Sequence, residues 1–149
     1  MKKITLLISL FVVVSCATTY QNEGFSGGYT ETQLDVDVYS VVFNGNGFTS
    51  LEKTKDFTLL RSAELTLKQG YKFFIIINSS SFIDKNQGST PVQTYNYSTQ
   101  SYNTTQQQFT ASKPKSSNTI KMLMSKPSNT FSYNAEFLVR SIKARYEIE

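Results

Sequence analysis

Apolar residues are most concentrated at the start of the chain. The run Ile4–Val14 follows two lysines and is interrupted by only one threonine and one serine. A helix that crosses a bilayer needs about 20 apolar residues, and this run is about half as long. A short basic start followed by a short apolar stretch is typical of a secretory signal peptide. We therefore predict a signal peptide over residues 1–15.

After residue 28, four stretches rich in β-branched and aromatic residues predict strands. They cover residues 36–43, 71–77, 92–97 and 119–125. The stretch at 71–77 is almost wholly apolar, so we expect a central strand with both faces largely covered. In the stretch at 119–125, Ile120 and Met122 are expected on one face with Met124, and Lys121 on the other.

Two further stretches show the spacing of amphipathic helices. The first covers residues 49–69, with a capping box between Thr49 and Glu52 and a stop at Gly70. Its apolar arc comprises Leu59, Leu60, Ala63 and Leu67 with Phe57 at the edge, opposite Lys55, Thr58, Ser62 and Gln69. Leu51 and Leu65 lie outside this arc, so contacts on both sides of the helix are expected.

The second helix is predicted over residues 134–146, capped by Asn134 or Ser132. Its apolar stripe comprises Ala135, Leu138, Val139, Ile142 and Tyr146. The element order predicts an α+β domain with two layers, in which two helices pack on one face of a mainly antiparallel sheet of about four strands. The first two strands, joined by a helix, would be parallel if adjacent.

Polar segments define the rest of the organisation. Residues 16–28 are polar and contain glycine, which predicts a flexible tether. The single domain is expected to span residues 29–149. Residues 98–118, rich in Ser, Thr, Gln and Asn, are predicted to form a polar loop within it.

The apolar run ends in Val13-Val14-Ser15-Cys16, which resembles the bacterial lipobox, and Cys16 is the only cysteine in the chain. The resemblance implies that Cys16 becomes the first residue of the mature protein and carries three acyl chains. One acyl chain alone anchors a protein only marginally, whereas several make release negligible. Ala17, in place of an aspartate, implies sorting to the outer membrane, with the domain facing the periplasm.

Composition excludes several kinds of site. The chain has no His and no Trp. Of its 15 basic residues, two lie in the signal, and the remaining 13 against 11 acidic residues give a charge of +2. Nucleic acid would require a clustered basic face, so we expect no nucleic-acid partner. With Cys16 acylated, no imidazole or thiol remains for a metal site or for Ser-His-Asp or Cys-His catalysis. We therefore expect no cofactor and no enzymatic activity.

Several motifs in the predicted domain carry a resemblance to a known family. They are Gly45-Asn46-Gly47-Phe48-Thr49, the helical stretch Leu59–Leu67, Gly70-Tyr71, the strand at Ile120, Lys126-Pro127 and the final helix from Ala135 to Tyr146. With these motifs the chain resembles a family of short, uncharacterised bacterial lipoproteins. The resemblance covers most of residues 28–149 apart from the polar middle. It implies lipid anchoring in the envelope and no catalytic role.

Charged and aromatic residues supply the candidate contacts. Arg61 and Glu64 are three residues apart on the first helix, a spacing at which side chains pair. A salt bridge between helix and sheet is the favoured interpretation, and a binding carboxylate is the alternative. Tyr95 and Tyr97 in the exposed strand, with Tyr102 and Phe109 further along the polar tract, are aromatic rings among amides. Such rings stack on sugars or dock on a partner. Covering one sheet face beneath the loop is the simpler interpretation of these rings.

Acidic pairs are the remaining candidates for chemistry. Asp35 and Asp37 would share one strand face. We interpret them as the solvent-exposed face of the segment that leads into the first strand, rather than as an acid/base pair or a calcium site. A carboxylate-based hydrolase would need these two residues, or Glu64 with Asp84, in one cleft. The sequence therefore predicts a lipid-anchored, non-catalytic envelope domain that contacts another envelope protein. The alternative is a periplasmic module that binds a glycan or peptidoglycan fragment through its tyrosine-bearing strand.

Overall fold

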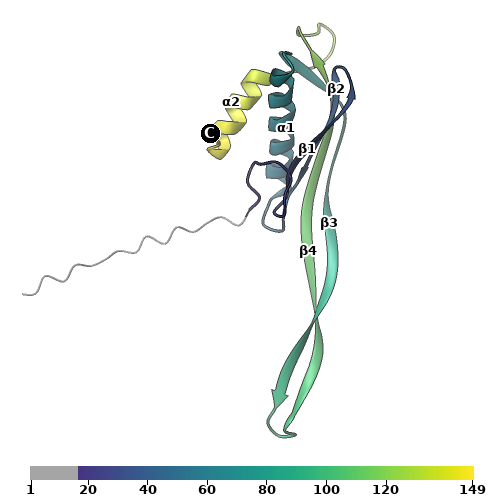
Figure 1. Cartoon of the computed structure of the whole chain (residues 1–149), viewed down its shortest axis with the longest axis vertical. Helices are drawn as coiled ribbons and strands as arrows, with labels where there is room; N and C mark the ends of the chain where they lie inside the picture. Colours follow the sequence, from purple (N-terminus) through teal and green to yellow (C-terminus); the bar gives the residue numbers. More distant parts are fainter. Residues whose placement is uncertain (1–16) are drawn as a thin grey trace, which may run out of the picture.

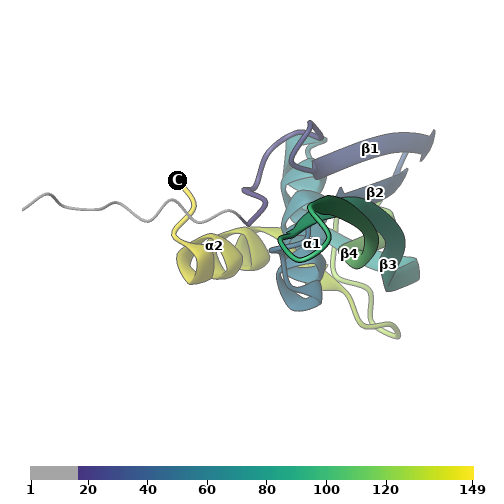
Figure 2. The same ribbon diagram turned by 90° about the horizontal axis from the view of Figure 1, so that it is seen from below.

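The computed structural model describes residues 17–149, so the predicted signal peptide and Cys16 lie outside the described residues. The described chain forms two helices and one sheet. The elements are β1 (Gly28–Asp35), β2 (Val38–Asn44), α1 (Leu51–Lys68), β3 (Phe73–Asn96), β4 (Ser101–Leu123), β5 (Tyr133–Asn134) and α2 (Ala135–Tyr146). The predicted α+β class, with both helices on one side of an antiparallel sheet, is confirmed (Figures 1 and 2). The sheet has five strands in place of about four.

The strand order is β1-β2-β4-β3-β5, and every neighbouring pair is antiparallel. β4 lies between β2 and β3, so these two strands run in the same direction without pairing. The two strands joined by the first helix were predicted to form a parallel pair if they were adjacent. They are not adjacent, so no parallel pair forms between them. β1 pairs only with β2 and is an edge strand that the sequence pattern did not predict.

Helix α1 lies between the sheet and α2, so the expected contacts on both sides are confirmed (Figure 2). Thr58 and Ser62, predicted to lie opposite the apolar arc on a polar face, are both fully buried. Thr54, Thr58, Ser62 and Thr66 form a stripe in which each hydroxyl donates to the carbonyl four residues earlier, at 2.8–2.9 Å. Thr58 Oγ1 also lies 3.5 Å from the carbonyl oxygen of Ser116 in β4. Internal hydrogen bonding thus lets polar side chains pack against the sheet.

The helix ends agree only partly with the capping signals. Ser50, and not Thr49, caps α1, because its hydroxyl accepts from the backbone N–H of Lys53. The predicted capping box is therefore wrong. Gln69 is the C-cap of α1, and Gly70 follows with a φ of +83°, as expected for a left-handed stop. Asn134 caps α2 by accepting from the backbone N–H of Phe137, which confirms one of the two predicted caps.

The core lies between the helices and the upper half of the sheet. Its buried residues include Tyr39, Val41, Ala63, Leu65, Phe74, Ile120, Met122 and Ala135. Ile120 and Met122 face the core while Lys121 is exposed, as predicted; Met124 follows the end of β4 and is exposed. The expectation that residues 71–77 are covered on both faces is wrong. Ile77 is exposed, so one face is partly open. β3 is also not central, because only the two-residue β5 lies beyond it in the sheet.

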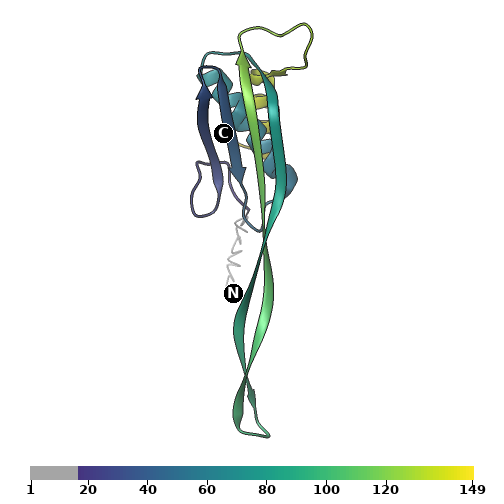
Figure 3. The same ribbon diagram turned by 90° about the vertical axis from the view of Figure 1, so that its right-hand side faces the viewer.

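The predicted polar loop at 98–118 is absent, because most of it is paired strand. β3 and β4 pair without interruption from Asn78↔Thr119 to Asn96↔Ser101. β2 pairs with β4 only as far as Lys115, so beyond that point β3 and β4 have no other strand beside them. We call the pairs from Asp84↔Lys113 to Asn96↔Ser101 the ribbon. It projects from the body as a twisted two-stranded extension (Figures 1 and 3).

The segment that leads into β1 also differs from its prediction as a flexible tether. Residues 17–27, here called the arm, are docked on the helix side of the sheet. Thr18 is buried: its N–H donates to Thr49 Oγ1 at 2.9 Å and its hydroxyl donates to the carbonyl of Ser26 at 2.7 Å. Gly27 has a φ of +93°, and a Cβ there would lie 2.2 Å from the carbonyl oxygen of Asn44. The arm therefore reaches β1 through a turn that glycine permits.

Candidate functional site

The ribbon is exposed on both faces along most of its length. It has 13 cross-strand pairs, counted from residue 84 to residue 96 of β3, and at about 3.3 Å per residue it is roughly 40 Å long. From Asn86 to Ser112 the chain has no charged residue. Amides and hydroxyls dominate this stretch, so the ribbon offers hydrogen-bonding groups without an electrostatic preference.

Both edges of the ribbon are open. The outward backbone N–H and C=O groups of β3 and β4 have no neighbouring strand there. Proteins commonly block such edges with lysine or proline, and here Pro91 is the only proline between residues 86 and 112. The ribbon is therefore long, uncharged from Asn86 to Ser112 and interrupted by a single proline in that stretch, which makes it a surface suited to contact with another molecule.

Three tyrosines gather at the tip of the ribbon. Tyr95 and Tyr102 are directly opposite each other across the strands, with ring centroids 5.0 Å apart. Tyr97, in the turn, meets Tyr95 edge-on at 4.9 Å and an interplanar angle of 89°. Tyr97 is 86% exposed. The structure thus brings together three of the rings singled out by sequence, Tyr95, Tyr97 and Tyr102.

Arg61 and Glu64 lie far from these tyrosines, in a charged network on α1. The Arg61 guanidinium binds the Glu31 carboxylate of β1 through two nitrogens, at 2.6 and 3.0 Å. It also contacts Glu64 at 3.3 Å and covers the ring of Tyr29 at 4.2 Å from the centroid. A planar guanidinium suits this combination of bidentate pairing and stacking. The predicted link between helix and sheet is therefore present, and it connects α1 to β1.

Glu64 joins two further parts of the chain to this network. Its carboxylate accepts from the hydroxyl of Tyr20 in the arm and lies 3.5 Å from Lys143 Nζ of α2. Burial, followed by the hydrogen bond to Glu64, raises the pKa of the Tyr20 hydroxyl well above its ordinary value of 10.0. Also in the last turn of α2, burial and a hydrogen bond to Asp56 raise the pKa of Tyr146 to about 12. Both tyrosines are thus held neutral in the folded chain.

These raised values predict a loss of stability in alkali. A tyrosine whose pKa is raised in the folded chain keeps its proton at a pH above about 10, where the same tyrosine in the unfolded chain loses it. Its stabilising contribution is complete below that pH and is lost as the pH rises toward the folded pKa. The slope is at most about 1.4 kcal/mol per pH unit for each tyrosine. We expect Tyr20→Phe to flatten this decline.

Urea unfolding measured at a series of pH values from 8 to 12 checks the prediction. Tyr146→Phe should flatten only the part of the decline between pH 10 and about 12, because the pKa of Tyr146 is about 12. If both variants lose stability with pH as steeply as the unaltered chain, the proposed coupling of these hydroxyls to folding is refuted.

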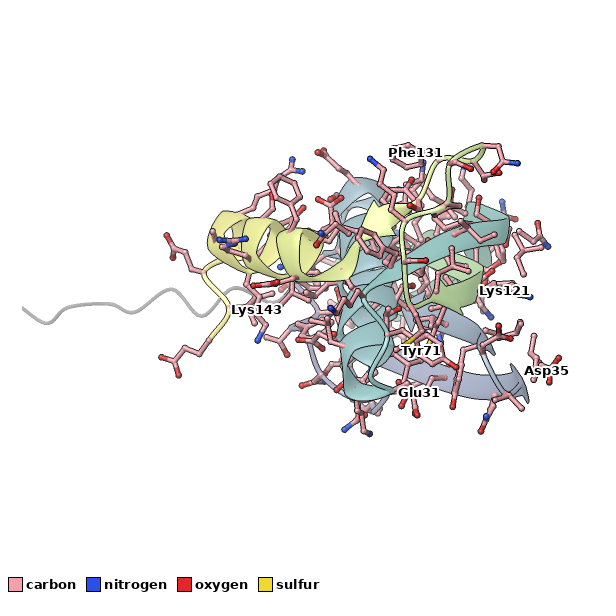
Figure 4. The ribbon with its side chains drawn as sticks, turned by 90° about the horizontal axis from the view of Figure 1, so that it is seen from above. Glu31, Asp35, Tyr71, Lys121, Phe131 and Lys143 are labelled. Atoms are coloured by element: carbon pink, nitrogen blue, oxygen red, sulfur yellow. The ribbon has the colours of Figure 1, made fainter. Side chains whose placement is uncertain are left out.

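The acidic pairs are placed apart from any shared cleft. Asp35 ends β1 and Asp37 lies in the turn to β2, so they do not share a strand face as predicted; Figure 4 shows Asp35 at the outer end of β1. Asp37 lies 3.7 Å from Lys121 Nζ. Asp84 lies at the base of the ribbon, opposite Lys113, whereas Glu64 lies in the α1 network. Within residues 17–149 no group of three or more acidic, His or Cys side chains is arranged to hold a metal.

Two cavities are small, and of the candidate residues only Asp84 lines either of them. One, of about 260 Å³, lies between α1 and the sheet and is lined by residues that include Lys55, Ser80 and Tyr133. The other, of about 270 Å³, lies between the arm and the base of the ribbon, beside Phe25, Asp84 and Lys113. Both are below the range of about 300–1,000 Å³ typical of ligand pockets. Neither is lined by Glu64 or by a tyrosine of the tip.

Comparison with protein-family models, curated proteins and solved structures finds no match to this chain. Within the described residues, no helix has the length and apolar character needed to cross a membrane. The candidate site therefore depends on the chain's own geometry. Sequence reasoning missed Glu31, Tyr20 and the ribbon itself, and the alternation of Thr, Tyr and Val at 92–97 was the only local signal of the extended strand.

Proposed function

We propose that this chain is a lipid-anchored protein of the bacterial outer membrane that faces the periplasm and presents its ribbon to another envelope component. The role is one of contact and not of catalysis. The observation that carries the proposal is the ribbon: 13 strand pairs outside the body, uncharged over residues 86–112 and open at both edges. A folded domain rarely keeps so long an exposed strand pair unless it is used.

The anchor is supported by the lipobox at Val13–Cys16 and by the lone cysteine. Growth with labelled palmitate should give a labelled protein whose first residue is Cys16. Cys16→Ser should abolish both the label and the cleavage. An unlabelled product that still begins at Met1 would refute the envelope assignment.

The contact role is tested by shortening the ribbon. Replacing residues 87–110 with Asn-Gly would close the strands after the pair Asn86↔Ala111 with a two-residue turn. We expect the shortened protein to fold and remain anchored but to lose the crosslinks that the unaltered protein forms in intact envelopes. Crosslinks mapped to α2, or an unchanged set of crosslinked partners in the shortened protein, would contradict the proposal.

A second candidate function is favoured by the three tyrosines of the tip. Exposed rings stack on the apolar faces of sugars, and the surrounding amides and hydroxyls match sugar hydroxyls. The absence of charge suits a neutral glycan or a peptidoglycan fragment. This role differs from the first because it requires saturable binding of a small carbohydrate to the purified protein.

Titration of peptidoglycan fragments and neutral oligosaccharides separates the two roles. If the tip binds sugar, Tyr97→Ser should weaken binding by about tenfold, the equivalent of about 1.4 kcal/mol. Phe137→Ser, which changes an exposed ring on α2, should leave it unchanged. Absence of saturable binding would leave the ribbon as a protein contact.

A further inference from the structure

The arm leaves little length of chain between the proposed lipid and the folded body. Thr18 is the second residue after Cys16, yet it is buried and hydrogen-bonded to three other residues. Its hydroxyl donates to Ser26 and accepts from the backbone N–H of Asn46 at 2.9 Å, while its own N–H donates to Thr49. Two residues span at most about 7 Å. A lipid on Cys16 would therefore hold this part of the body against the bilayer surface.

Two exposed phenylalanines lie in the loops that bind Thr18. Phe25 is fully exposed and precedes Ser26, and Phe48 is 75% exposed and follows the loop of Asn46. The Phe48 loop is ordered, because the backbone N–H of Phe48 donates to Asn46 Oδ1 at 3.0 Å. Both rings are thus held in water beside the expected lipid, without a partner in the body that covers them.

We infer that Phe25 and Phe48 insert into the outer-membrane lipid beside the acyl chains of Cys16, and so orient the body on the bilayer. The inference rests on the proposed lipid anchor. The partner is lipid because aromatic rings favour the bilayer interface. Charge does not direct the contact: Glu23 and Asp84 balance Lys113 and Lys115 around the cavity beside Phe25. The arm lies on the helix side of the sheet, and the ribbon projects from the body beyond it (Figures 1 and 2).

The absence of tryptophan gives a direct test, because a single introduced tryptophan reports only its own surroundings. Phe25→Trp and Phe48→Trp are compared with Phe131→Trp. Phe131 is a matched control, since it is 74% exposed and lies in the loop between β4 and β5, at the end of the body opposite the ribbon. Figure 4 shows it at the rim of that end.

Each full-length, palmitate-labelled variant is reconstituted in vesicles of phosphatidylcholine with or without brominated acyl chains. We expect blue-shifted emission and at least about a twofold quenching by bromine for F25W and F48W, as for rings about 5–10 Å below the surface. F131W should show neither change. Since the contact is apolar, raising the salt concentration should not reduce the quenching.

Two outcomes overturn the inference while leaving the anchor intact. One is labelled protein in which F25W and F48W are not quenched, and the other is equal quenching of all three variants. Protein without label would instead refute the proposed anchor. Circular dichroism of each variant confirms that the body remains folded.

Discussion

Replacing Phe57 with alanine should lower the free energy of unfolding by about 3–5 kcal/mol, the cost typical of removing a fully buried aromatic ring. Phe57 is 1% exposed. Its ring contacts Tyr20 of the arm, Phe43 of β2 and Tyr146 of α2, with centroids 5.1–5.4 Å apart. The substitution therefore leaves a cavity where the arm, the sheet and both helices meet.

Urea unfolding measures the effect as a lower urea concentration at the unfolding midpoint, while the slope of the unfolding free energy with urea concentration stays unchanged. Phe137→Ala is the control, because Phe137 is an exposed phenylalanine on α2, and it should change stability by less than about 0.5 kcal/mol. If Phe57→Ala costs no more than Phe137→Ala, the arm and α2 do not pack on this ring as described.

Arg61→Ala should cost about 2–4 kcal/mol, somewhat less than the about 3–5 kcal/mol for breaking a fully buried ion pair. The reduction follows from partial exposure, since the side chains of Arg61 and Glu31 are 14% and 28% exposed. Loss of the guanidinium leaves the Glu31 carboxylate without its cation and uncovers the ring of Tyr29. The stability of Arg61→Lys should fall between that of Arg61→Ala and that of the unaltered chain, because an ammonium keeps the charge without the bidentate and stacked geometry.

The same unfolding measurement tests this network, with Arg140→Ala as the control for loss of an exposed arginine on α2. We expect Arg61→Ala to be the more destabilising by at least about 1.5 kcal/mol. Equal effects of the two substitutions would show that the Arg61 network contributes little, and would reopen Arg61 and Glu64 as residues available to a partner.

Periodic burial explains which elements were predictable. Both helices and the segment around Ile120 pack against a core, so their apolar residues repeat at 3.6 or 2 positions. The signal peptide and the lipobox remain predictions of the same local kind, since they depend on residues adjacent in sequence. The burial of the stripe of Thr54, Thr58, Ser62 and Thr66 could not be predicted in this way. Their hydroxyls bond to carbonyls of their own helix, so these side chains can be buried although they count as polar in the sequence pattern.

The tertiary structure decided where the remaining polar residues lie. Neither β1 nor the ribbon covers the core, so neither has a buried apolar face. The alternation that marks a strand is therefore missing from their sequences apart from residues 92–97. Arg61 could be expected to pair, but Glu31 lies 30 residues away and Tyr20 meets Glu64 across 44. Local periodicity records which side of an element is buried; it holds no information on which distant segment lies against a polar surface, and that depends on how the whole chain packs.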